Sequence, residues 1–148
     1  MSNGAVRSIA PARSWPLTRE AWDRLVDEVS QLRESVSTLA GQGLEEGIVR
    51  LPVAIASRRL ETLGEVLERC ELVDETPCVA IGRRATLRDG DGAVMSYEIV
   101  FPGDGDVEQG WVSADSPLGH ALLGASAGDV VHVDAPAGPW SVTVVSVH

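Results

Sequence analysis

The chain has 148 residues, of which 44% are hydrophobic, and this is enough to form a core in one medium domain or two small modules. Its net charge of -10 argues against direct, sequence-specific binding to DNA or RNA, because contact with phosphates needs a basic surface. All 12 cationic residues are arginine, which excludes chemistry that needs a lysine Schiff base or a P-loop lysine. We find no signal peptide and no apolar run of membrane-spanning length, so we expect a soluble, cytoplasmic protein without a membrane partner.

The first predicted element is a long helix that follows an irregular start. Residues 1–16 show no periodicity and are predicted to form a flexible arm. Thr18 is a candidate N-cap, and Glu20 lies in the first turn, where the helix dipole favours an acid. Apolar residues then recur three and four positions apart, as in a coiled coil. This seam comprises Trp22, Leu25, Val29, Leu32, Val36 and Leu39, and glycines at 41 and 43 are expected to end the helix.

A second helix with the same apolar spacing is predicted next. Pro52 suits its first turn, because a helix leaves the amide there without a partner in any case. Its seam comprises Val53, Ala56, Leu60, Leu63, Leu67 and Cys70. The loop at residues 41–51 is short and contains glycine, which favours two antiparallel neighbours. We therefore predict a coiled-coil hairpin over residues 17–75.

The apolar period changes from about 3.5 to 2 after residues 74–77, and this change marks the predicted domain boundary. Strands are predicted at residues 78–81, 84–88, 93–101, 109–113, 130–135 and 140–147. Residues 89–92 and 136–139 have the composition of turns. The fold class is therefore α+β, with the helical hairpin followed by a small antiparallel sheet in a domain over residues 76–148.

One short helix interrupts these strands. Ser116 can cap its N-terminus, Pro117 suits its first position, and Gly124 can adopt the left-handed conformation that ends a helix. So short a helix is not stable alone, so we expect Leu118, Leu122 and Leu123 to pack against the strands at residues 130–147.

Two acidic segments are candidates for metal contact. Residues 102–108 carry three alternating carboxylates, but they lie between predicted strands and lack the frame of an EF-hand, which favours a polar connecting loop. Glu45 and Glu46 lie at the predicted hairpin tip and could complete the coordination of a Mg²⁺ ion held by another protein. A merely polar, exposed tip is the alternative, and the spacing alone favours it.

The C-terminal residues resemble a known family. Residues 97–106 read Tyr-Glu-Ile-Val-Phe-Pro-Gly-Asp-Gly-Asp, residues 116–119 read Ser-Pro-Leu-Gly, and residues 128–130 read Gly-Asp-Val. In this order they resemble the C-terminal domain of Gre-type (GreA/GreB-like) bacterial transcription elongation factors over about residues 79–147. A helical hairpin in front of that domain is also typical of the family.

The resemblance implies an FKBP-like domain that docks on RNA polymerase at the rim of its secondary channel while the coiled coil enters the channel. The family segment that contacts the polymerase matches Asp115, Ser116 and Pro117, and a helix N-terminus with free amides suits such a surface. Leu118 adjoins them as a core or edge contact. The resemblance thus implies a regulator and not an enzyme, since any RNA cleavage would belong to the polymerase.

The hairpin tip departs from the family pattern. Cleavage-stimulating members carry Asp and Glu within an Asp-Leu-x-Glu-Asn-type sequence, and these acids bind the second catalytic Mg²⁺ of the polymerase. Here Leu44 is followed by Glu45 and Glu46, with no Asp and no following Asn, and the arms are shorter. We therefore expect a divergent, non-cleaving regulator that obstructs the channel or competes with cleavage factors. It would hold no cofactor of its own.

Three alternatives stay open at this point. In the first, the chain is a true cleavage factor that rescues backtracked complexes, and Glu45 and Glu46 share Mg²⁺ with the polymerase. An FKBP-like fold also suggests a peptidyl-prolyl isomerase by analogy, with Trp111, Trp140 and Tyr97 among the few aromatics available for a pocket. The third alternative is an interaction module whose acidic hairpin serves another partner.

Overall fold

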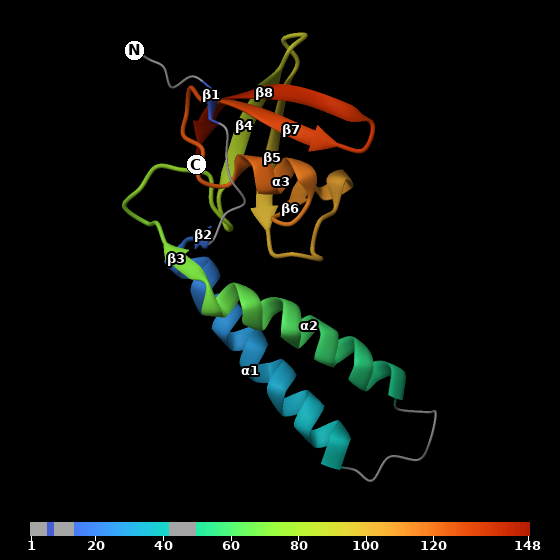
Figure 1. Cartoon of the computed structure of the whole chain (residues 1–148). Coiled ribbons are helices and arrows are strands. Elements are labelled where there is room, and N and C mark those ends of the chain that lie inside the picture. Colours follow the sequence, from blue (N-terminus) through green and yellow to red (C-terminus); the bar gives the residue numbers. More distant parts are fainter. Residues whose placement is uncertain (1–5, 8–13, 42–49) are drawn as a thin grey trace.

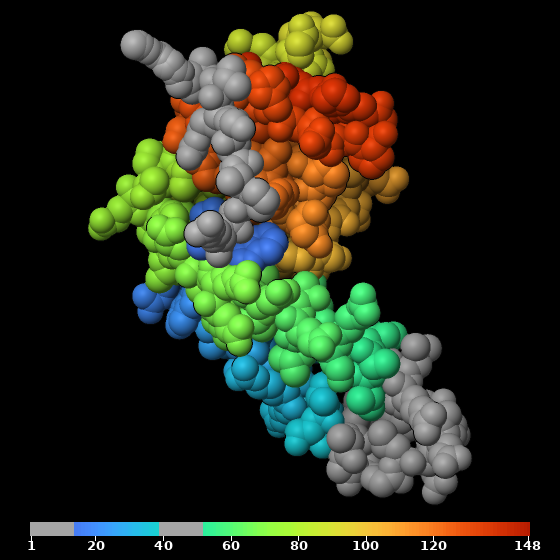
Figure 2. Space-filling model, viewed as in Figure 1, coloured from blue at the N-terminus to red at the C-terminus, as the bar shows by residue number. Residues whose placement is uncertain are grey.

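A helical hairpin projects from a six-stranded sheet (Figure 1). The structure, a computed structural model, describes residues 6–7, 14–41 and 50–148. The hairpin consists of α1 (Arg19–Gly41) and α2 (Arg50–Glu68), which are about 35 and 29 Å long at 1.5 Å per residue. Every helix in the described residues is too short or too polar to span a lipid bilayer. The far ends of α1 and α2 lie well away from the sheet, so the molecule is elongated (Figures 1 and 2).

The two helices bury their shared seam at the end near the sheet. The buried residues are Ala21, Leu25 and Val29 of α1 with Leu63 and Val66 of α2. Trp22 and Leu67, which the periodicity places in the seam, are only partly buried, because their neighbours Ala21 and Val66 occupy the interior. The prediction therefore located the apolar face correctly but was one residue off at two positions.

Two side chains cap the first turn of α1. The Thr18 hydroxyl accepts a hydrogen bond from the Ala21 amide at 3.1 Å, as predicted for an N-cap. The Asp74 carboxylate accepts from the Arg19 amide at 3.0 and 3.1 Å. These acceptors satisfy amides that lack helical partners. Asp74 also links the start of the hairpin to the chain that leaves it.

A pair of short strands joins the hairpin to the rest of the molecule. Strand β2 (Trp15–Leu17) precedes α1, strand β3 (Cys70–Leu72) follows α2, and the two pair in parallel. We call this pair the hairpin base. Its ladder includes hydrogen bonds from Trp15 N–H to Arg69 O at 2.8 Å and from Val73 N–H to Leu17 O at 3.1 Å. Two predictions are corrected here: Trp15 and Pro16 do not belong to a flexible arm, and α2 ends before Cys70.

The sheet has the strand order β1-β7-β8-β4-β5-β6. Its strands are β1 (Val6–Arg7), β4 (Arg84–Asp89), β5 (Val94–Val100), β6 (Trp111–Ser113), β7 (Val130–Ala135) and β8 (Gly138–Val147). The four central strands pair antiparallel, which confirms the α+β class. The outer pairs β1–β7 and β5–β6 are parallel, contrary to an all-antiparallel sheet. β6 runs parallel to β5 because residues 101–110 first carry the chain back along β5.

Residues 78–81 were predicted to form a strand but make only isolated bridges. Cys78 pairs with Ser126 on one side, and Ile81 pairs with Leu17 of the hairpin base on the other. All four residues are buried, so their apolar run reflects a chain segment threaded through the interior. A short apolar run of this kind does not distinguish a buried segment from a strand.

One continuous core joins the hairpin to the sheet. The apolar residues at the sheet end of the hairpin belong to the same cluster as those of the sheet. Besides the hairpin residues already named, this core includes Leu17, Val79, Ile81, Leu87, Ile99, Phe101, Leu122, Val131, Val133, Val142 and Val144. The hairpin is therefore anchored by its sheet end, while the remainder extends into solvent.

Gly64 in the interior of α2 offers a test of hairpin stability. A methyl group built on its Cα would meet no heavy atom within 4 Å. Glycine in a helix interior is less favourable than alanine by about 1 kcal/mol. Gly64→Ala should therefore raise the free energy of unfolding by about that amount, measured by urea denaturation followed by circular dichroism. A destabilised variant would contradict the open surroundings of this residue.

Candidate functional site

The short helix α3 (Pro117–Leu122) is built as predicted. Ser116 is its N-cap, and its hydroxyl accepts from the Gly119 amide at 3.1 Å and donates to the Ser113 carbonyl at 2.6 Å. Pro117 occupies the first turn, and Gly124 just beyond the helix has a left-handed φ of 85°. α3 contacts β7, and Leu122 is completely buried. The helix is therefore held in place by its caps and by the sheet beneath it.

The four residues predicted to dock are consecutive and lie at the N-terminal end of α3. Asp115 and Pro117 are exposed, while Ser116 and Leu118 are half-buried. The Ser113 hydroxyl donates a hydrogen bond to the Asp115 carboxylate. We call Asp115, Ser116, Pro117 and Leu118 the docking edge. Within the docking edge, the exposed side chains are therefore those of Asp115 and Pro117.

Gly119 allows α3 to lie directly against strand β6. A Cβ atom at this position would lie 2.0 Å from the Ser113 carbonyl oxygen and 2.9 Å from its carbon. Both atoms belong to the backbone, so no side-chain movement could relieve the overlap. The docking edge therefore depends on the absence of a side chain at Gly119.

The docking edge borders an apolar pocket of about 350 Å³, which we call the α3 pocket. Its remaining walls come from β5, β6, β7, β8 and the short 3-10 helix η1 (Val107–Gln109). The pocket is lined by Tyr97, Gly105, Val107, Trp111, Val112, Ser113, Ser116, Pro117, Leu118, Val133, Ala135 and Trp140. Val107 is 74% exposed and Trp111 is 39% exposed at its edge. The surface therefore combines an apolar cavity with the polar residues at the start of a helix.

Val107, which lines the α3 pocket, was not among the residues predicted for a site. It lies between Asp106 and Glu108 in the segment predicted to be a polar loop. The Asp106 carboxylate caps η1 by accepting from the Glu108 amide at 3.1 Å, and this turn presents Val107 to solvent. A lone apolar residue between two acids was the available signal.

No group of three or more His, Cys, Asp or Glu side chains that could hold a metal ion occurs in the described residues. Glu45 and Glu46, the predicted Mg²⁺ contacts, lie outside the described residues. The structure thus describes the residues of the docking edge, while the predicted roles of the edge and of the tip both stay predictions.

Comparison with known proteins gives consistent results. The family model for the C-terminal domain of transcription elongation factors GreA/GreB matches residues 74–148. Transcription elongation factor GreA of Thermotoga neapolitana is 30% identical over 149 residues, covering 88% of this chain and 95% of that protein. Transcription elongation factor GreB of Xanthomonas axonopodis is 39% identical over 95 residues, covering 61% of this chain and 56% of that protein.

A solved structure is similar as well. The crystal structure of the GreA factor homolog 1 (Gfh1) protein of Thermus thermophilus is 25% identical, covers 92% of this chain and 99% of its own, and has a TM-score of 0.44. The match of the C-terminal family model, together with full-length similarity to a GreA protein, places the whole chain in one family. The chain belongs to the GreA/GreB family of transcription elongation factors.

Proposed function

We propose that the protein regulates RNA polymerase by docking through the α3 edge and inserting its hairpin into the secondary channel. The observation that carries this proposal is the position of the docking edge on the rim of the α3 pocket. An apolar cavity beside a few oriented polar groups is the usual form of a site that receives an anchoring side chain of a partner. Members of this family regulate the polymerase and are not enzymes, which argues against the isomerase alternative.

The charge of the chain supports a protein partner over nucleic acid. Its net charge of -10 opposes close approach to phosphates. Covering the apolar lining of the α3 pocket with an apolar protein surface removes both from water, which favours binding. We therefore infer that any effect on RNA passes through the polymerase in the cytoplasm.

We further propose that this member does not stimulate transcript cleavage. The tip sequence Leu44-Glu45-Glu46 lacks the Asp and the Asn of cleavage-stimulating relatives. Adjacent carboxylates in a loop need not face one metal ion, and each helical turn removed from the arms withdraws a tip by about 5 Å. Occupying the channel without supplying both Mg²⁺ ligands would obstruct it or exclude a competing factor.

Transcript cleavage by a stalled, backtracked elongation complex tests the proposal. We expect the wild-type protein to bind the polymerase, to leave the cleavage rate unchanged, and to reduce the stimulation caused by a cleavage-active Gre factor. The double variant Glu45→Ala/Glu46→Ala is the matched control, and it should behave like the wild type in the cleavage assay.

Two results would contradict different parts of this proposal. Stimulation by the wild type that the double variant loses would establish the alternative, a true cleavage factor whose Glu45 and Glu46 share Mg²⁺ with the polymerase. Failure of the wild type to bind the polymerase at all would instead remove the docking proposal and favour an interaction module with another partner.

A further inference from the structure

Arg59 on α2 connects three separate parts of the chain. Its Nε donates to the Glu28 carboxylate of α1 at 3.1 Å. One terminal nitrogen donates to the Pro102 carbonyl at 2.5 Å, and the other donates to the two Asp104 carboxylate oxygens at 2.9 and 3.0 Å. Glu28 belongs to the hairpin, while Pro102 and Asp104 belong to the loop after β5. We call this group the Arg59 bridge.

The bridge is shielded more than an ordinary surface ion pair. The Arg59 side chain is 21% exposed, against 40% for Glu28 and 42% for Asp104. Burial alone would lower the pKa of Arg59, but the hydrogen bond to Glu28 and the charges of Asp104 and Glu28 outweigh it and raise the pKa above its ordinary value. The guanidinium therefore stays charged, and its several donors suit simultaneous contact with both acids.

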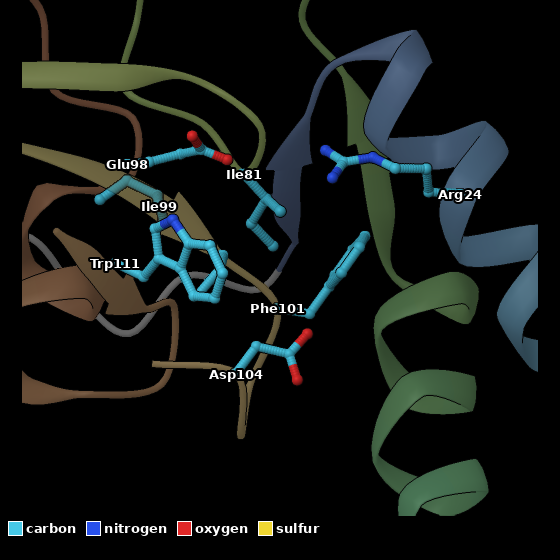
Figure 3. A pocket seen from close by; sticks show the side chains of 8 residues that line it. Arg24, Ile81, Glu98, Ile99, Phe101, Asp104 and Trp111 are labelled. Carbon is cyan, nitrogen blue, oxygen red and sulfur yellow. The ribbon is translucent and has the colours of Figure 1, made fainter. Parts of the chain in front are cut away.

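A second pocket lies between Arg24 of α1 and one edge of the sheet, and Asp104 of the bridge lines it (Figure 3). This α1 pocket has a volume of about 250 Å³. Figure 3 shows Arg24 of α1 on one side, Glu98 and Trp111 of the sheet on the other, and Asp104 at the lower end. The core joins the hairpin to the sheet near the base, but the space between Arg24 and this edge of the sheet is open, so the Arg59 bridge adds a contact that the core does not supply there.

The bridge acts at a distance from the point where the hairpin could pivot. Arg59 lies nine residues before the end of α2, which places it about 14 Å from the hairpin base at 1.5 Å per residue. A rotation of α2 by about 10° about its last residue would move its first residue, about 27 Å away, by about 5 Å. A bond at Arg59 resists such a rotation better than contacts within the base.

We infer that Arg59 is a positioning residue that fixes the angle between the hairpin and the C-terminal domain by holding Asp104 and Pro102. Its consequence for the polymerase rests on the proposed function, since the angle sets the direction in which an inserted hairpin points. For the free protein it stands on the bridge and the α1 pocket alone.

Nuclear magnetic resonance on the full chain tests the inference without the polymerase. Residual dipolar couplings of the wild type should fit one alignment tensor for the hairpin and the sheet together. In Asp104→Asn and Arg59→Gln the hairpin should be reoriented relative to the sheet, so that the wild-type structure no longer fits the couplings of both parts with one tensor, because the domain-side contact is weakened or lost. Arg58→Gln, which removes the neighbouring exposed arginine, is the matched control and should keep the single tensor.

Glu28→Gln separates a positioning role from a purely structural one. If Arg59 serves only to hold α1 to α2, Glu28→Gln should reproduce the effect of Arg59→Gln and Asp104→Asn should have none, which would overturn the inference. If Arg59 sets the angle, Asp104→Asn should have the larger effect. Because Asp104 lies in a partly exposed loop, this variant decides the question even if Arg59→Gln does not fold.

A second readout uses the polymerase. Asp104→Asn should bind it with an unchanged Kd, because the docking edge is intact, yet should lose its transcriptional effect at saturating concentration. An unchanged effect, like an unchanged tensor, would contradict a role for the bridge in aiming the hairpin. If the wild type itself does not bind, the proposed function fails while the solution couplings still decide the role of Arg59.

Discussion

Gly119→Ala should lower the free energy of unfolding by about 3 kcal/mol, the upper end of the usual cost of overpacking. The added Cβ would lie 2.0 Å from the Ser113 carbonyl oxygen, so either α3 or β6 must move. That movement would also break the hydrogen bonds of Ser116 to Ser113 and Gly119. Urea denaturation followed by tryptophan fluorescence measures the loss.

Gly124→Ala is the control for the effect of Gly119→Ala. Gly124 also needs its conformational freedom, with φ at 85°, but a Cβ there meets no atom within 4 Å. Its replacement should therefore cost only the backbone strain of about 1–2 kcal/mol. Equal losses for the two variants would mean that strain, and not the close approach of α3 to β6, explains the requirement at Gly119.

Val107→Asp should weaken binding to RNA polymerase by about 30-fold, equivalent to about 2 kcal/mol. The side chain is 74% exposed, so the substitution removes little from the core. In a complex that covers the α3 pocket, however, the new carboxylate would be buried against apolar surface without a partner, which is unfavourable. A competition assay with labelled protein measures the Kd.

Val94→Asp provides the matched control for Val107→Asp. Val94 is 64% exposed on β5 and does not line the α3 pocket. It should bind the polymerase like the wild type. If Val107→Asp and Val94→Asp both bound the polymerase as tightly as the wild type, the α3 pocket would not be the docking surface. Pro117→Ala would then test the docking edge separately.

The short helix α3 was predictable because its structure is encoded locally. Ser116, Pro117 and Gly124 each act within a few residues of their own position, and a cap, a first-turn proline and a left-handed glycine are all visible in the sequence. The hairpin seam was predictable for the same reason, because its periodicity repeats along one segment. Two seam positions differed by one residue, because Ala21 and Val66 took the buried places predicted for Trp22 and Leu67.

Apart from the exposure of Val107, the features that were not predicted depend on residues far apart in the chain. Arg59 and Asp104 are 45 positions apart, and each alone has the character of a solvated surface residue. The whole hairpin separates β2 from β3 in the sequence, so no turn motif between them indicates that they pair. The α3 pocket needs six elements to meet. Local periodicity contains none of this information, because it does not specify which distant segments become neighbours.

The pairing of β2 with β3 allows the length of the hairpin to change among such proteins without a change at its base. The chain enters and leaves the hairpin at neighbouring points that are bonded to each other, so equal deletions or insertions in both arms need not disturb the core. Each heptad exchanged changes the reach of the hairpin by about 10 Å. Reach can therefore vary while the sheet domain stays the same, and one such domain can carry hairpins of different lengths.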